Sequence, residues 1–159
     1  MESLNFYIQY EKVRSLTFKK FKLLLEKSQM KTVSEITIRE LSSTYSPNGL
    51  YFMFSSGGEL AYVGKASSRS FIERIPSHFD QREHAWMNTV PKKILKRGNA
   101  DTYDDALQRA LDLQLVMMGF KDRTMSIRLE TALRAFLQPR LNPGRKKVQD
   151  HQCLCEFES

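Results

Sequence analysis

The chain has 159 residues, of which 41% are hydrophobic, and its 25 Lys and Arg outnumber its 18 Asp and Glu, giving a net charge of +7. This length fits one compact domain and excludes two full ones, and 7 glycines and 5 prolines are too few for a collagen-like or low-complexity chain. The Lys and Arg residues form clusters, which suit a polyanionic partner, although solvated helix faces account for such clusters equally well.

The N-terminal residues lack the features of an export signal. Glu2 stands where a signal peptide has a basic residue, and the polar residues 9–12 interrupt any apolar region. No window approaches the roughly 20 consecutive apolar residues that a membrane span requires. We therefore expect a cytoplasmic protein with no membrane partner.

Residues 1–47 are predicted to form a basic, helical N-terminal extension. Apolar residues recur at helical spacing over residues 15–30, and Thr17 is a candidate N-cap. Lysines occupy the opposite face of this predicted helix, among them Lys19, Lys20 and Lys22. Turn-forming residues at 42–49 then mark the boundary to the next domain.

A β-hairpin followed by a helix is predicted after this boundary. Residues 50–54 and 60–63 are short, apolar and rich in aromatic or β-branched side chains, and Ser and Gly at 55–58 supply a turn between them. Apolar residues of 67–79 lie on one helical face, although Pro76 favours an early end to this helix.

Residues 80–101 are predicted to be mainly irregular, and the residues after them are predicted to form regular secondary structure. Residues 80–101 are polar and are expected to hold only a short basic helix at 92–96, whereas Thr102 is expected to cap a second helix. Residues 111–120 fit either an extension of that helix or a buried strand, and we favour the strand. Residues 126–137 form a further amphipathic helix.

The C-terminal residues 143–159 are predicted to be a basic, flexible tail. The basic cluster that begins it includes Lys146. Cys153 and Cys155 are separated by one residue, so a disulfide between them would be strained, and His151 adds too few ligands for a zinc site. We expect free thiols in a reducing compartment.

Several side chains suited to phosphodiester chemistry follow one another along the chain. Two tyrosines lie near the ends of the predicted hairpin strands, and an arginine and a histidine at i and i+4 share one face of the next helix. A single glutamate lies on the later helix. These phenols, guanidinium, imidazole and carboxylate are the components of metal-assisted phosphodiester hydrolysis, and the residues are Tyr51, Tyr62, Arg74, His78 and Glu130.

The order of these motifs resembles the GIY-YIG nuclease family. The similarity covers residues 49–142 of a predicted domain at 48–142. It rests on five ordered motifs: Gly49-Leu50-Tyr51, Tyr62-Val63-Gly64-Lys65-Ala66, Arg74-x-x-x-His78, Glu130-x-x-Leu133 and Pro139-x-Leu141-Asn142. The resemblance implies an α+β fold, with a small three-stranded antiparallel sheet flanked by helices. The hairpin and the strand predicted at 111–120 would supply its three strands.

Two departures from the family pattern leave alternatives for two site residues. The segment before Arg74 is slightly longer than usual, so Arg69 competes with Arg74, and residues 80–101 resemble an insertion, so His84 competes with His78. The i, i+4 spacing favours Arg74 with His78.

The residue types indicate roles in hydrolysis. Glu130 is the predicted ligand of one Mg²⁺ or Mn²⁺ ion, with water completing the octahedron. Tyr51 is the candidate general base, and its phenolate would have to be favoured by Lys65 or by the metal, because an unperturbed tyrosine has a pKa near 10. Tyr62 would orient water or phosphate.

The remaining residues are predicted to stabilise or bind the phosphate. Arg74 presents donors that match the developing phosphorane charge, and His78 would hydrogen-bond a phosphate oxygen or share the proton transfer. The resemblance implies that Asn142 holds the site or a backbone turn. The candidate substrate-binding residues are Lys65 and Asn142, with Lys19, Lys20 and Lys22 on the N-terminal helix.

Together these features predict a metal-dependent DNA endonuclease. The alternative is a non-catalytic nucleic-acid-binding module on the same fold, and a structural or protein-binding domain is a further rival. RNA is an open alternative to DNA, and restriction, repair, mobile-element and toxin nucleases all fit. Because the chain is short, specificity would come from residues 80–101, from the N-terminal segment, from a homodimer or from a partner protein. Trp86 is a candidate for base stacking or for core packing.

Overall fold

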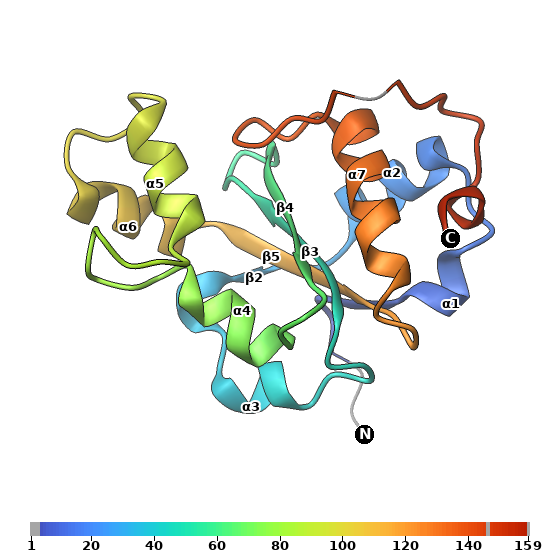
Figure 1. Ribbon diagram of the computed structural model, residues 1–159, viewed down its shortest axis with the longest axis horizontal. Helices are drawn as coiled ribbons and strands as arrows, with labels where there is room; N and C mark the ends of the chain where they lie inside the picture. Colours follow the sequence, from blue (N-terminus) through green and yellow to red (C-terminus); the bar gives the residue numbers. More distant parts are fainter. Residues whose placement is uncertain (1–3, 146, 159) are drawn as a thin grey trace.

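A five-stranded mixed sheet runs through the centre of the computed structural model, which describes residues 4–145 and 147–158 (Figure 1). The strand order is β1-β5-β3-β4, and β2 pairs with the start of β5. β3 pairs in antiparallel fashion with both β4 and β5, whereas β1 runs parallel to β5. The strands are β1 (Tyr7–Gln9), β2 (Lys31–Thr32), β3 (Gly49–Phe54), β4 (Leu60–Ala66) and β5 (Gln114–Gly119).

The α+β class is confirmed, but the prediction of a three-stranded antiparallel sheet is wrong in its extent. β4, β3 and β5 form the predicted antiparallel unit, and β1 and β2 from the N-terminal segment extend it. The parallel pairing of β1 makes the sheet mixed. Strands of three and two residues are too short to show an alternating pattern, so periodicity could not reveal them.

Several of the described helices begin at capping residues that are visible in the sequence. Thr17 caps α2 by accepting a hydrogen bond from the backbone N–H of Lys20 (3.2 Å). α4 is capped by Ser70, whose hydroxyl bonds Glu73 (2.8 Å), rather than by the serines before it. The helices are α1 (Tyr10–Val13), α2 (Phe18–Lys27), α3 (Ile38–Ser42), α4 (Phe71–Ser77), α5 (Thr89–Lys96), α6 (Tyr103–Leu111) and α7 (Met125–Leu137), with 3-10 helices η1 (Val33–Glu35) and η2 (Leu154–Phe157).

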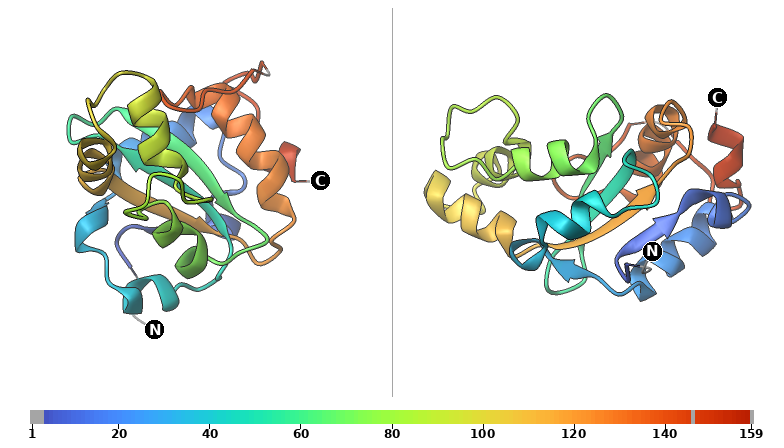
Figure 2. Two further views of the ribbon diagram at one scale, coloured as in Figure 1. Left: turned by 60° about the vertical axis from the view of Figure 1, so that its left-hand side comes forward. Right: turned by 90° about the horizontal axis from the view of Figure 1, so that it is seen from below.

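Alternation along the strands divides the core into two layers. On β3, Tyr51 and Met53 point to one face and pack with α4, α5 and α6. Leu50 and Phe52 point to the other face and pack with α2 and α7. Figure 2 shows the sheet between these two groups of helices, so the side chain of Tyr51 and the helix α2 lie on opposite faces.

The C-terminal segment, predicted as a flexible tail, packs against the N-terminal helices in part of its length. Leu154 is completely buried, and the backbone N–H of Phe18 donates to the carbonyl of Gln152 (2.9 Å). The hydroxyl of Tyr10 donates to Glu158 (2.7 Å). Both cysteines are free thiols. Lys146 of the predicted basic cluster lies outside the described residues.

Candidate active site

Tyr51 on β3 and His78 at the end of α4 form a buried pair. The hydroxyl oxygen of Tyr51 lies 2.6 Å from Nε2 of His78, and both side chains are completely buried. The ring of Tyr62, on the neighbouring strand β4, packs edge-on against the imidazole with centroids 5.4 Å apart. The two tyrosines and the histidine are therefore in mutual contact.

The surroundings of His78 determine which ring nitrogen carries the proton. The backbone N–H of Val90 donates to Nδ1 (3.3 Å), so Nδ1 is an acceptor without a proton. Burial, and secondarily the charge of Arg74, hold the pKa of His78 well below its usual value, so the ring is neutral. Nε2 therefore carries the proton and donates a hydrogen bond to the oxygen of Tyr51.

The two tyrosines are neutral phenols in this environment. Burial raises the pKa of Tyr51 well above 10, and Tyr62 contributes in the same direction, while Arg74 opposes the shift. Burial likewise raises the pKa of Tyr62, again against the effect of Arg74. Forming a phenolate at Tyr51 at neutral pH consequently requires an additional positive charge nearby.

A cleft of about 350 Å³ opens over this pair. Its lining comes from β3, β4, the β4–α4 loop, α4, α5 and α7. Predicted site residues that line it are Tyr51, Tyr62, Lys65, Arg74, Glu130 and Asn142. His78 lies behind Tyr51 rather than in the lining. Arg69, the alternative to Arg74, lines the same cleft, whereas His84 is exposed on the loop after α4.

The motif glycines leave room for these groups. A Cβ added at Gly64 would overlap the ring of Tyr51, because β4 passes directly over that ring. A Cβ at Gly49 would overlap the backbone of Met118 on β5. Glycine is therefore needed at both positions for close packing of the sheet and the tyrosine, not for an unusual backbone angle.

Arg74 is fixed at the edge of the cleft by three hydrogen bonds. Its guanidinium donates to Oγ of Ser77 (2.9 Å), to the carbonyl of Met87 (3.0 Å) and to Oγ1 of Thr89 (3.4 Å). These contacts tie α4 to the start of α5. The guanidinium is thus pre-positioned, which reduces the entropy lost when it binds an anion.

Glu130 projects from α7 into the cleft and is only 7% exposed. Its Oε1 pairs with Arg134, one turn later, at 3.3 Å. Burial raises the pKa of Glu130, and the charges of Arg134 and Lys65 counteract this effect. Within residues 4–145 and 147–158, no cluster of three or more His, Cys, Asp or Glu side chains is arranged to hold a metal, so Glu130 is a single carboxylate donor.

Asn142 and Arg134 hold the segment after α7 against the sheet. The side-chain amide of Asn142 accepts from the N–H of Val63 (3.1 Å) and donates to its carbonyl (2.6 Å). Arg134 donates to the carbonyl of Asn142 (2.8 Å). The amide of Asn142 thus ties the segment after α7 to β4 beside the cleft.

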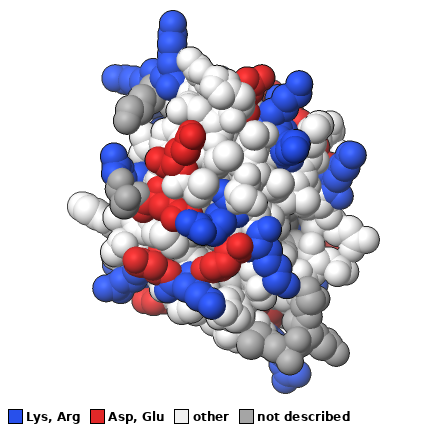
Figure 3. All heavy atoms as spheres, turned by 90° about the vertical axis from the view of Figure 1, so that its right-hand side faces the viewer, with Lys and Arg blue, Asp and Glu red and all other residues white. Residues whose placement is uncertain are grey.

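The three lysines predicted to extend the substrate surface do not lie at the cleft. Lys19, Lys20 and Lys22 are exposed on α2, on the sheet face opposite to Tyr51. On the side of the molecule that faces right in Figure 1, Lys and Arg alternate with Asp and Glu instead of forming one basic patch (Figure 3).

Two cations that line the cleft, Lys93 on α5 and Arg134 on α7, were not among the predicted site residues. Arg134 stands four residues after Glu130, a spacing that favours contact on a helix and could have identified it. Lys93 lies in the short basic helix predicted at 92–96, but the direction in which this helix turns its lysines depends on its packing against α6.

Comparison with protein-family models, curated proteins and solved structures finds no match for this chain. The resemblance to the GIY-YIG family therefore rests on the motif residues alone. A search of the described helices for one long and apolar enough to span a bilayer finds none.

Proposed function

We propose that this chain is a metal-dependent endonuclease that hydrolyses DNA phosphodiester bonds in the cleft above Tyr51. The observation that carries the proposal is the hydrogen bond between Tyr51 and His78 beneath a cleft that also receives Arg74, Lys65 and Glu130. A base, fixed cations and a carboxylate around one cavity are the groups that phosphodiester hydrolysis requires.

In this mechanism Tyr51 accepts the proton of the attacking water. The Tyr51 phenol first gives its own proton to solvent water in the cleft. Because Nε2–H of His78 donates to the Tyr51 oxygen, the histidine stabilises the resulting phenolate, which then takes the proton of the attacking water. Arg74 lowers the pKa of Tyr51 against the larger effect of burial. His78 acts through the tyrosine in this mechanism and does not contact the phosphate.

Arg74 stabilises the negative charge that develops on the phosphate. Its guanidinium is held in place before substrate arrives, so little reorganisation is needed during the reaction. Lys65, on the exposed side of β4, and Tyr62, beside Tyr51, complete the wall of the cleft. Tyr62 is placed to hydrogen-bond a phosphate oxygen or the water.

The donor set fits one Mg²⁺ or Mn²⁺ ion. Mg²⁺ is commonly held by one or two carboxylates, with waters and substrate phosphates as its other ligands, and Glu130 offers one such carboxylate in the cleft. When bound, the ion supplies charge stabilisation at the phosphate and the leaving oxygen. Arg134 keeps Glu130 oriented toward the cleft through their ion pair.

The charge around the cleft favours a polyanionic substrate. Lys65, Arg69, Lys93 and Arg134 line it together with Arg74. The pKa of Lys93 is lowered by burial and by the neighbouring charge of Arg134, so these cations repel one another when no anion is bound. A phosphate backbone would relieve this repulsion, and the net charge of +7 supports the same class of ligand.

The proposal is tested by nicking of supercoiled plasmid with Mg²⁺, with Mn²⁺ and with EDTA. We expect metal-dependent nicking that Glu130→Gln abolishes and that Glu26→Gln, an exposed carboxylate on α2, preserves. DNA binding without cleavage of plasmid, linear or branched DNA would support the non-catalytic binding module instead. Cleavage of RNA alone would reassign the substrate.

A further inference from the structure

The loop between α4 and α5 exposes the only tryptophan of the chain. Trp86 is 91% exposed, although tryptophan is among the side chains that proteins most often bury over much of their area. This exposure excludes the core-packing alternative considered for Trp86. Tryptophan is enriched at binding interfaces, because its indole combines a large apolar surface with a polar N–H.

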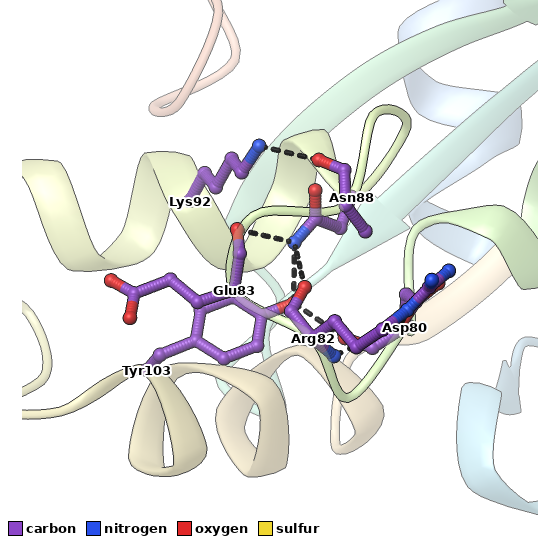
Figure 4. Close-up of polar contacts among 7 residues, drawn as sticks. Asp80, Arg82, Glu83, Asn88, Lys92 and Tyr103 are labelled. Atoms are coloured by element: carbon purple, nitrogen blue, oxygen red, sulfur yellow. Dashed lines mark hydrogen bonds and ion pairs between the residues drawn. The ribbon is translucent and has the colours of Figure 1, made fainter.

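Hydrogen bonds hold this loop in one conformation (Figure 4). Asn88 is completely buried, and its Nδ2 donates to the carbonyl of Arg82 (3.1 Å) and to the hydroxyl oxygen of Tyr103 (2.7 Å). Tyr103 in turn donates to the carbonyl of Asp80 (2.6 Å). On the other side of the loop, Nζ of Lys92 donates to the carbonyl of Ala85 (2.7 Å). The indole is consequently presented by a preorganised backbone.

The loop is also attached directly to the candidate active site. Met87, the residue after Trp86, lines the cleft, and its carbonyl accepts the hydrogen bond from Arg74 at 3.0 Å. Three residues further, Val90 donates to His78. The backbone that carries Trp86 is thus joined to the wall of the cleft.

We propose that Trp86 stacks on an unpaired nucleobase beside the scissile phosphate, so that the preferred substrates are DNA molecules with an unpaired base at the cleavage position. Base–aromatic stacking needs a free base face, which an intact duplex does not offer and a flap, fork or bulge does. Lys92 and Lys93 on the adjoining helix supply cations for the flanking backbone. This inference rests on the proposed nuclease function and specifies its substrate.

The single tryptophan provides a direct measurement. In EDTA, tryptophan emission is recorded while the protein is titrated with three oligonucleotide substrates of equal length: a full duplex, a duplex with one unpaired base, and a flap. We expect strong quenching by the flap and by the unpaired base, and little quenching by the full duplex.

Matched variants show whether the stacking contributes to binding. Trp86→Ala is expected to weaken binding of the flap about tenfold, the effect typical of removing one base–aromatic stack, while duplex affinity stays near that of the wild type. Trp86→Phe should retain part of the preference. Leu23→Ala, which removes an exposed apolar side chain from α2 on the opposite sheet face, should change neither affinity.

Two outcomes would overturn the inference. One is equal quenching by all three substrates with unchanged affinity of Trp86→Ala for the flap. The other is a concentration-dependent change of emission without DNA, which would assign Trp86 to contacts between copies of the chain. A cleavage assay distinguishes failure of this inference from failure of the proposed function. If flap DNA quenches Trp86 emission but is never cut with Mg²⁺ or Mn²⁺, the stacking proposal is supported and the proposed nuclease activity is contradicted.

Discussion

The hydroxyl of Tyr51 lies 2.6 Å from Nε2 of His78, and the backbone N–H of Val90 occupies the other ring nitrogen. This arrangement makes the histidine a donor to the tyrosine oxygen. The pKa of Tyr51 therefore reflects two opposing effects. Burial favours the neutral phenol and raises the pKa, whereas the hydrogen bond from His78 favours the phenolate.

The rate of cleavage should rise with pH. Because burial places the pKa of Tyr51 well above 10, the phenolate fraction at Tyr51 increases about tenfold per pH unit until that pKa, as modified by bound cations, is reached. Single-turnover cleavage rates measured across neutral and alkaline pH would show this slope. A flat profile for the wild type would contradict a base with a raised pKa.

The stability of the fold should fall on acidification because of His78. The folded pKa of His78 lies well below its ordinary value of about 6.5, so below that pH the unfolded chain binds the extra proton and unfolding becomes more favourable. The free energy of unfolding should therefore be lower at about pH 5 than at about pH 7.5, because these two values lie on either side of the ordinary histidine pKa.

Urea unfolding at both pH values measures this effect. His78→Gln should show a smaller decrease of unfolding free energy on acidification than the wild type. His84→Gln, at an exposed position on the following loop, should show the full decrease. Equal decreases in all three proteins would place the titrating group elsewhere.

The hairpin and the last helix could be predicted from sequence because their signals are local. Aromatic and β-branched runs flank a Ser-Gly turn in β3 and β4, and α7 has a clear apolar stripe. β1 has three residues and a parallel partner far away in sequence, so only tertiary pairing reveals it. The N-terminal residues thus complete the sheet as well as forming helices.

Part of the candidate site could be predicted from the motif residues, but its surroundings could not. Tyr51, Tyr62 and Glu130 are brought to one cleft, as expected from the motif order. The amphipathic pattern of α2 shows that its lysines face solvent, but not which side of the sheet the helix covers. The ordered loop that presents Trp86 depends on Asn88, whose burial no local pattern indicates.

Adding a methyl group at Gly64 should disturb both stability and activity. A Cβ at this position would overlap the ring of Tyr51, and overpacking of a buried site typically costs about 1–3 kcal/mol. Gly57→Ala, in the β3–β4 turn, is the control, because its nearest neighbour to a new Cβ is Oγ of Ser55 at 3.8 Å. Urea unfolding that shows equal stability for both variants would contradict the close packing.

Replacing Arg74 with lysine should slow cleavage more than it weakens binding. Lysine keeps the charge but lacks the planar set of donors that contacts Met87 and the phosphate, and removal of one preorganised donor typically costs about 100-fold in rate. Arg82→Lys, paired with Asp80 outside the cleft, should leave the rate near wild type. Equal cleavage rates for the two variants would contradict a role of Arg74 in stabilising the transition state.

The salt dependence of DNA binding should come from the cleft and not from α2. Lys65→Gln with Lys93→Gln should reduce the slope of log affinity against log salt by about 0.9 for each phosphate that is no longer neutralised. Changing Lys19, Lys20 and Lys22 to Gln together should leave the slope nearly unchanged, since they lie on the opposite face of the sheet. If the α2 variant reduced the slope and the cleft variant did not, the DNA would bind at α2 and not at the cleft.

The most direct test of the proposed mechanism is single-turnover cleavage of a flap DNA by Tyr51→Phe, with DNA affinity measured in parallel. Phenylalanine fills the same buried space but cannot accept a proton, so we expect a rate at least about 100-fold lower with nearly unchanged affinity. Cleavage by Tyr51→Phe at the wild-type rate would contradict the assignment of Tyr51 as the base and, with it, the proposed mechanism.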